Sequence, residues 1–271
     1  METRSLYVHI PFCESICSYC DFCKVYYDQK QSDLYLQRLQ EELSQIENHN
    51  LKTIYIGGGT PSALNDEQLE KLMSMLKPYS LEVEEYCMEV NPESMDYYKL
   101  KILKKGGINR LSIGVQTFQN HLLKEIERHH NTIQVKNIIK YAKEIGFDNI
   151  SIDLMYGLPK QTKEDIEKDI ETIINYKNWD EIVTHNEKGE YGHIHHIMTH
   201  NLVDEACDKT GTNAKVMYFG KYYKKINIPE TGFEKIDEDL LKQKDEISKL
   251  YPSQKKTIDK LHHMFPYENW T

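Results

Sequence analysis

Hydrophobic and polar positions along the first two-thirds of the chain follow two alternating patterns. Short apolar runs rich in β-branched and aromatic residues predict strands, and stretches with apolar residues three and four positions apart predict amphipathic helices. The predicted strands cover residues 6–10, 53–56, 86–90, 110–115 and 149–154. Helices are expected to begin near Ser32, Asn65, Ser94, Asn131 and Thr162. Because strands and helices alternate, the sequence predicts an α/β fold with a parallel sheet and right-handed crossovers.

Residues at the helix ends agree with this pattern. Asn65 is followed by Gln68, which is the spacing of a capping box at a helix start. Gly106 and Gly146 follow two of the predicted helices, where glycine favours termination. Ligands of such sheets lie at the carboxyl ends of the strands, so we expect the chemistry of this part of the chain there.

Length and charge narrow the possible functions. The 271 residues leave room for one large domain or two modest ones, and 39% hydrophobic residues suffice for a core. A formal charge of −9, from 43 acidic and 34 basic residues, argues against nucleic acid as the main partner. No apolar run approaches the length of a membrane span, and the first residues form no apolar leader. We therefore expect a reducing, cytoplasmic location.

Three closely spaced cysteines, Cys13, Cys17 and Cys20, follow the first predicted strand. Their thiolates can hold three irons of a [4Fe–4S] cluster and leave the fourth iron open, whereas most clusters have four cysteine ligands. Cys23 adds a fourth thiol, so a zinc site with four thiolates and a disulfide pair are alternatives. Zinc sites usually combine two separated ligand pairs, and a reducing compartment disfavours disulfides, so the spacing favours the cluster.

This cysteine loop resembles that of the radical S-adenosylmethionine (SAM) enzymes, in particular the oxygen-independent coproporphyrinogen III oxidases and their heme-chaperone relatives. Four further segments of residues 1–176 resemble motifs of this family in the same order, and an Arg-containing stretch lies among them. The resemblance implies Cys13, Cys17 and Cys20 as cluster ligands. It implies as SAM-binding residues Tyr7, Gly57, Gly58, Gly59, Thr60, Glu89, Gln116, Arg128 and Asp153.

The resemblance also implies a fold, cofactors and an activity. Residues 1–176 would form a partial (β/α) barrel of about five parallel strands. A reduced [4Fe–4S] cluster would cleave SAM to a 5′-deoxyadenosyl radical, which takes hydrogen from a substrate, while the protein orients the cofactor. The substrate would be porphyrin-related, and an electron donor such as flavodoxin or ferredoxin would be a partner. The alternative within the family is a protein that binds heme or an iron–sulfur cluster without turnover.

Beyond Tyr176 the chain ceases to resemble this family. Residues 179–271, a smaller α/β fragment expected to begin at 177, resemble the PIG-L/LmbE-like zinc de-N-acetylases, so the chain has the character of a chimera. That resemblance implies His196 as a zinc ligand and His193 as its partner in the zinc site. The family's N-terminal metal motif is absent, and catalytic zinc needs three protein ligands. A solvated His-rich helix is the alternative.

The remaining segments carry less chemistry. His193, His196 and His200 would share one face of a helix. Residues 181–185 are a candidate sixth strand at the edge of the first sheet, and residues 216–219 are a further predicted strand. Two helices are expected at the end of the chain. They cover residues 237–250 and a stretch that follows Pro252 and ends near His263.

Overall fold

The computed structural model describes residues 5–46, 51–220 and 234–249, together with five single residues: Lys255, Asp259, His262, Tyr267 and Glu268. The chain forms two compact units, residues 1–162 and 163–271. This boundary lies before the expected one at 176, because helix α6 (Lys163–Ile174) packs on helix α8 (Ile194–Thr210) of the second unit.

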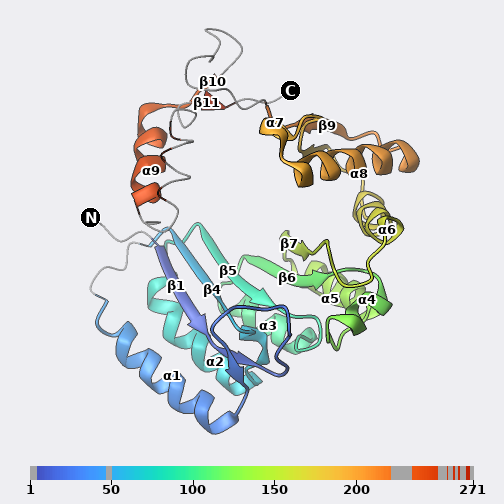
Figure 1. Ribbon diagram of the computed structural model, residues 1–271. Coiled ribbons are helices and arrows are strands. Elements are labelled where there is room, and N and C mark those ends of the chain that lie inside the picture. Colours follow the sequence, from blue (N-terminus) through green and yellow to red (C-terminus); the bar gives the residue numbers. More distant parts are fainter. Residues whose placement is uncertain are drawn as a thin grey trace. The chain divides into compact units, whose positions relative to one another are not determined.

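The first unit contains one five-stranded sheet (Figure 1). Its strands are β1 (Ser5–Ile10), β4 (Thr53–Gly58), β5 (Glu85–Val90), β6 (Arg110–Gln116) and β7 (Asn149–Leu154). They run parallel in the order β1-β4-β5-β6-β7. The structure therefore confirms the predicted α/β architecture of five parallel strands.

Helices connect these strands and pack beside one another on one face of the sheet (Figure 1). They are α1 (Gln29–Leu43), α2 (Asp66–Leu76), α3 (Tyr97–Lys105) and α5 (Thr132–Ile145), and a shorter helix, α4 (Asn120–Glu125), precedes α5. Short 3-10 turns cover Pro61–Ala63 and Lys77–Tyr79.

Capping side chains decide where these helices begin. Asn65 forms the predicted capping box at the start of α2. The starts predicted at Ser32 and Ser94 were wrong. Helix α1 begins at Gln29 and α3 at Tyr97, because the carboxylates of Asp28 and Asp96 accept backbone N–H bonds from the first turns.

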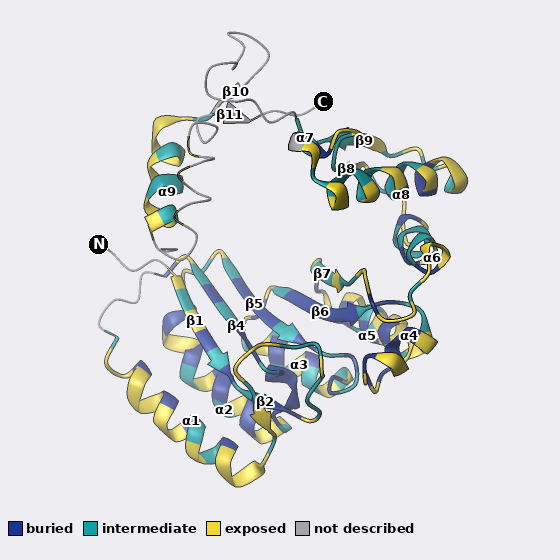
Figure 2. Ribbon diagram, in the orientation of Figure 1, coloured by how far each residue is buried: buried dark blue, intermediate teal, exposed yellow. Residues whose placement is uncertain are grey.

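The two faces of the sheet differ in polarity, because successive strand residues point to opposite sides. Figure 2 shows buried residues along β4, β5 and β6. The side chains facing the helices form the main core, with Val8, Ile10, Ile54, Ile56, Met88, Val90, Leu111 and Ile113 almost fully buried. The alternate positions include Tyr55, Glu89, Ser112 and Asp153, which leaves a polar face opposite the helices.

The cysteine loop is held by a small parallel pair of strands, β2 (Phe12–Cys13) and β3 (Val25–Tyr26). Backbone bonds from Gly59 N to Ile10 O and from Thr60 N to Phe12 O, both 2.8 Å long, fix this pair against the end of β4. Cys13 is therefore anchored on a strand, whereas Cys17 and Cys20 lie in the loop that follows it.

The second unit has its own small sheet. Strand β8 (Glu181–Thr184) pairs in parallel with β9 (Lys215–Tyr218), and α7 (Gly189–Gly192) lies between β8 and α8 in the sequence. The prediction that residues 181–185 extend the first sheet was wrong. Ile182 instead packs with Ile174 and Ala206 in a separate hydrophobic cluster, which keeps β8 in this unit.

The end of the described chain contains helix α9 (Glu238–Lys249), as predicted, and an antiparallel pair, β10 (Glu234–Lys235) and β11 (Tyr267–Glu268). Most of the helix expected after Pro252 lies outside the described residues. Across the part of the chain that the structure describes, no helix has the length and apolar character that crossing a membrane requires.

Candidate functional site

A cavity of about 550 Å³ opens in the first unit beside the cysteine loop and the carboxyl ends of β4 to β7. Most of the residues predicted to bind the cluster or SAM line it. They are Cys13, Cys17, Cys20, Gly58, Gly59, Thr60, Glu89, Gln116, Arg128 and Asp153. Six separate segments of the sequence thus contribute to one site, as expected for a parallel sheet.

Tyr7 and Gly57 do not line this cavity. Tyr7 is half exposed on β1, where its ring stacks on Tyr55 and its hydroxyl lies 3.1 Å from Nδ1 of His9. A Cβ atom at Gly57 would come within 2.9 Å of the Glu89 carboxylate, so this glycine makes room for a neighbouring side chain. Both residues lie next to the site without forming its wall.

The thiol of Cys13 is buried, and the Thr60 hydroxyl donates to its Sγ at 3.4 Å. Burial raises the pKa of this thiol, which the Thr60 bond and the charge of Lys24 partly offset. The Lys24 ammonium donates to the Cys20 carbonyl, so a cation lies within the loop. Cys23 is exposed and does not line the cavity, which disfavours the alternative of four thiolates at one zinc.

The glycine loop approaches the cysteine loop too closely for any larger residue. A Cβ atom at Gly59 would lie 2.8 Å from the Pro11 carbonyl carbon and 3.0 Å from Cys13 Sγ. The amide of Gly58, whose φ is +119°, donates to Glu89 Oε2 at 3.1 Å. The N–H groups of this loop bond within the protein, so the carbonyl oxygens are the backbone groups left for a ligand. Carbonyl oxygens accept hydrogen bonds, for example from an ammonium group.

Glu89 links three parts of the site. Its carboxylate also accepts a 2.7 Å hydrogen bond from the Tyr55 hydroxyl. Burial and this bond to a carboxylate raise the pKa of Tyr55, so Tyr55 stays a hydrogen-bond donor. On the neighbouring strands, the Ser112 hydroxyl donates to Asp153 Oδ2 at 3.3 Å. Two carboxylates, Glu89 and Asp153, therefore face the cavity with fixed orientations.

Gln116 has a left-handed backbone, with φ of 67°, at the last position of β6. A register shift between Gly114 and Gln116 interrupts the pairing with β7 at the same place. Such a conformation is unfavourable for a residue other than glycine, and strain of this kind clusters at functional sites. The distortion ends the strand pairing where Gln116 meets the cavity.

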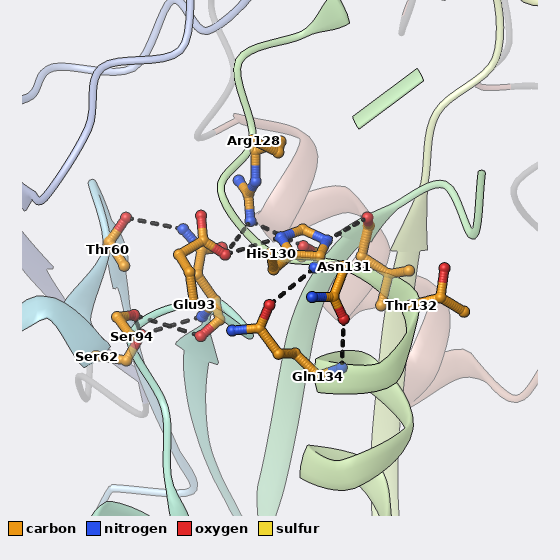
Figure 3. Close-up of polar contacts among 12 residues, drawn as sticks. Thr60, Ser62, Glu93, Ser94, Arg128, His130, Asn131, Thr132 and Gln134 are labelled. Carbon is orange, nitrogen blue, oxygen red and sulfur yellow. Dashed lines mark hydrogen bonds and ion pairs between the residues drawn. The ribbon is translucent and has the colours of Figure 1, made fainter. Parts of the chain in front are cut away.

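A buried ionic group supports Arg128 (Figure 3). Nη2 of Arg128 donates to the Gly114 carbonyl at 3.0 Å and lies 3.2 Å from Glu93 Oε2. Nδ1 of His130 lies 2.8 Å from the same carboxylate oxygen, and its Nε2 lies 3.1 Å from the Val115 carbonyl. The Glu93 carboxylate thus contacts two basic side chains, of which Arg128 lines the cavity.

Charge controls the ionisation of this group. Burial alone would raise the pKa of Glu93, but the hydrogen bond from His130 and the charge of Arg128 outweigh burial and lower it. For Arg128, burial acts to lower the pKa, and the Glu93 carboxylate reverses this effect and raises it. Nε of Arg128 is buried without a hydrogen-bond partner among the described residues.

Several residues of the site lie in segments that resemble family motifs but were not among the residues predicted to bind the cluster or SAM. Tyr19, Asn91 and Ser112 line the cavity, while Glu93 and His130 hold Arg128 from behind. Asn91 also donates to the Thr60 hydroxyl at 3.0 Å. Two local signals were available, because Asn91 and Glu93 follow Glu89 within one segment and His130 stands two positions after Arg128.

The second unit contains the predicted histidines. His193 precedes α8 as its N-terminal flanking residue, so it does not share a helical face with His196 and His200 as predicted. His196 lies in the first turn of α8, and its nearest ligand-type neighbours are His185 and Glu190. The His193 ring is 4.5 Å from that of His196, centroid to centroid, but His193 is outside this group of three.

A parallel α/β sheet with a three-cysteine loop at its carboxyl edge is the architecture of an enzyme that handles a cofactor at the strand ends. Residues 7–173 match the model of the radical SAM superfamily. The chain belongs to this superfamily, and the match spans the strands and the cavity described above.

Individual relatives agree with this assignment. The heme chaperone HemW of Bacillus subtilis is 48% identical over 180 residues, which cover 64% of this chain and 47% of that protein. The oxygen-independent coproporphyrinogen III oxidase of Escherichia coli is 36% identical over 167 residues, or 59% of this chain and 36% of that protein. The solved structure of the Escherichia coli coproporphyrinogen III oxidase HemN superposes with a TM-score of 0.57 at 34% identity, covering 62% of this chain and 41% of that chain.

The chain spans about half the length of the curated relatives that it matches first. The family match ends at residue 173, before the segment that resembles the zinc de-N-acetylases. None of the matches described above concerns that family, so the chimeric character of the chain and a zinc site at His193 and His196 stay predictions.

Proposed function

We propose that this chain holds a [4Fe–4S] cluster through Cys13, Cys17 and Cys20 and binds SAM beside it in the same cavity. The observation that supports this most is that three thiols and the carboxyl ends of four parallel strands line one cavity. When bound, the cluster supplies the electron that cleaves the sulfonium bond of SAM. The superfamily to which the chain belongs implies both cofactors.

The polar groups of the cavity match the chemistry of SAM. An amino acid ammonium and ribose hydroxyls are donors, and Glu89, Asp153 and the glycine-loop carbonyls are acceptors. The guanidinium of Arg128, which lines the cavity, suits a carboxylate, because guanidinium–carboxylate bonds are charge-assisted. The side-chain amide of Gln116 offers both a donor and an acceptor to a ribose.

We infer the substrate class from the relatives. They are named as heme chaperones and coproporphyrinogen III oxidases, so we propose a porphyrin-related small molecule as substrate and an oxidoreductase activity. Reduction of the cluster needs an electron donor, for which a flavodoxin or ferredoxin is the proposed partner. Three reduced thiols are required, and all six cysteines are free, so we propose the cytoplasm as the compartment.

The test is production of 5′-deoxyadenosine by the anaerobically reconstituted, dithionite-reduced protein supplied with SAM. The wild-type chain is expected to form it, and Cys17→Ala is expected to abolish it. Cys23→Ala is the matched control, because Cys23 is in the same segment but exposed and outside the cavity. The proposal would be refuted if Cys17→Ala still formed 5′-deoxyadenosine. It would also be refuted if the wild-type protein, loaded with four irons per chain, formed none.

A heme-binding protein without turnover is the second candidate, and the similarity to the HemW heme chaperone favours it. Titration with heme would then give a stoichiometric Soret band, while the reduced, cluster-loaded protein would form no 5′-deoxyadenosine. Turnover of SAM without a heme spectrum would favour the oxidase-like activity instead.

A further inference from the structure

A second group of ligand-type side chains lies in the second unit and includes none of the residues that line the cavity. His185 follows strand β8, Glu190 lies in α7, and His196 lies in the first turn of α8. One ligand atom from each side chain lies within 4.8 Å of the others. In the described ranges, no other group of three such side chains meets this spacing.

The carboxylate of Glu190 lies against both imidazoles. Nδ1 of His185 is 3.2 Å from each carboxylate oxygen, and Nδ1 of His196 is 2.5 Å from Oε2. Two ligand atoms bound at about 2.1 Å to one tetrahedral ion are roughly 3.4 Å apart. The 3.2 Å separation of His185 and Glu190 is close to this value, whereas the 2.5 Å contact of His196 is a short hydrogen bond that would lengthen when both atoms bind one ion.

The backbone holds Glu190 in an unusual conformation. Gly189 and Glu190 have φ values of 58° and 56°, and the left-handed region is uncommon for a residue such as glutamate. The Asn186 side chain accepts the Glu190 N–H at 3.1 Å and so supports this turn. A Cβ atom at Gly189 would lie 3.1 Å from Cβ of His196, so the turn packs directly on the start of α8. The fold thereby directs the carboxylate toward the histidines.

A further layer of bonds supports the two histidines. The rings of His185 and His196 stack, with centroids 3.9 Å apart and planes 12° apart. Nδ1 of His200 donates to the His185 carbonyl at 2.8 Å, and its Nε2 is 3.3 Å from Asp204. The Tyr218 hydroxyl donates to the same Asp204 carboxylate at 2.9 Å. This network fixes the backbone of His185 beside its candidate ligand atom.

The three side chains are accessible to solvent. His185, Glu190 and His196 are exposed by 26%, 14% and 27%, respectively. An ion could therefore enter without unfolding of the unit, and a water molecule could complete its coordination. Metal sites with three protein ligands and one open position have this arrangement.

We propose that His185, Glu190 and His196 bind one divalent transition-metal ion of the zinc type. Imidazole suits zinc, cobalt and nickel, and two histidines with one glutamate form a known zinc ligand set. This site goes beyond the function proposed for the first unit. It also differs from the ligands implied by the sequence resemblance, because Glu190 and His185 replace His193 as partners of His196.

The test uses the full chain with Cys13→Ser, Cys17→Ser, Cys20→Ser and Cys23→Ser, so that thiolates of the cysteine loop cannot bind the added metal. Titration with Co²⁺, followed by visible absorption, is expected to saturate at one equivalent and to show no thiolate-to-cobalt band. Added Zn²⁺ should displace the cobalt. Because this protein cannot hold the cluster, the result is independent of the radical SAM proposal.

Variants then locate the ion. Glu190→Gln keeps the size of the side chain, and His196→Ala removes one ligand, so each should weaken Co²⁺ affinity at least about tenfold. His195→Ala is the control, because His195 is an exposed imidazole one position earlier that lies outside the group. Circular dichroism would verify that the variants fold. Lack of stoichiometric binding, or equal affinity in all three variants, would overturn the proposal.

Discussion

The Glu93 carboxylate lies 2.8 Å from Nδ1 of His130, and both side chains are almost fully buried. The same oxygen is 3.2 Å from Nη2 of Arg128, so one anion orients the only residue of this group that lines the cavity. Glu93 and His130 therefore act as positioning residues for Arg128, and this geometry leads to the first two predictions.

Glu93→Gln is expected to destabilise the protein by about 3 kcal/mol, because removing one partner of a buried pair leaves the other charge uncompensated. Urea denaturation would measure the loss. The control is Glu84→Gln, which breaks the exposed pair with Lys52 and should change the free energy of unfolding by less than about 0.5 kcal/mol. Equal effects of the two substitutions would contradict the role assigned to Glu93.

The stabilisation by Glu93 should depend on pH. The pKa of Glu93 in the folded protein lies below its ordinary value of 4.5, so the carboxylate contributes fully above pH 4.5. The contribution is lost as the pH falls below 4.5 through the folded pKa. We expect the difference in unfolding free energy between wild type and Glu93→Gln to be constant near neutrality and to shrink in acid. A difference that grows as the pH falls would have the wrong sign.

Gly59→Ala is expected to displace the cysteine loop, because the new methyl group would overlap Pro11 and Cys13. We expect a cost of about 1–3 kcal/mol, typical of overpacking, together with a lower iron content after reconstitution. Gly157→Ala serves as the control. Its φ of +77° imposes strain of about 1 kcal/mol, but no atom lies within 4 Å of the added Cβ. Iron content should be unchanged in the control.

Gln116 combines backbone strain with a place in the cavity wall. Gln116→Gly is expected to be more stable than Gln116→Ala by about 1 kcal/mol, since only glycine adopts a positive φ without penalty. Both variants lack the amide and should bind SAM more weakly than wild type. Thermal unfolding and SAM titration of the cluster-loaded proteins would separate the two effects. A glycine variant less stable than the alanine variant would show that the backbone is not strained.

Local patterns of the sequence predicted the sheet, and the resemblance to the radical SAM enzymes implied most of the residues that line the cavity. Strand and helix periods are written in consecutive residues, and the parallel order brings the strand ends to one edge. What escaped prediction depends on contacts between distant segments or on unusual backbone conformations. The Glu93–His130 contact requires β5 and β6 to be adjacent. The grouping of His185 with Glu190 depends on left-handed backbone conformations at residues 189 and 190, which the sequence did not predict.

The pairing partner of strand β8 could not be predicted from its own residues either. Its apolar residues suit any sheet, and a missing barrel strand made the first sheet a plausible partner. In the structure β8 pairs with β9, and Ile182 is partly buried against Ile174 and Ala206 of the second unit. The start of α1 was missed because its first turn, which begins at Gln29, carries no apolar residue, whereas the start of α3 was placed three residues too early, at Ser94 instead of Tyr97.

Because the two faces of the first sheet differ in polarity, the effect of a substitution should depend on which face the side chain points to. Along β6, substitutions at Leu111 and Ile113 should lower protein abundance through unfolding, since these side chains are in the core. Substitutions at the alternate positions, Ser112 and Gly114, should leave more folded protein with impaired ligand binding. In a saturation-mutagenesis map of β6, the positions that lower protein abundance and the positions that lower only SAM turnover should then alternate along the strand.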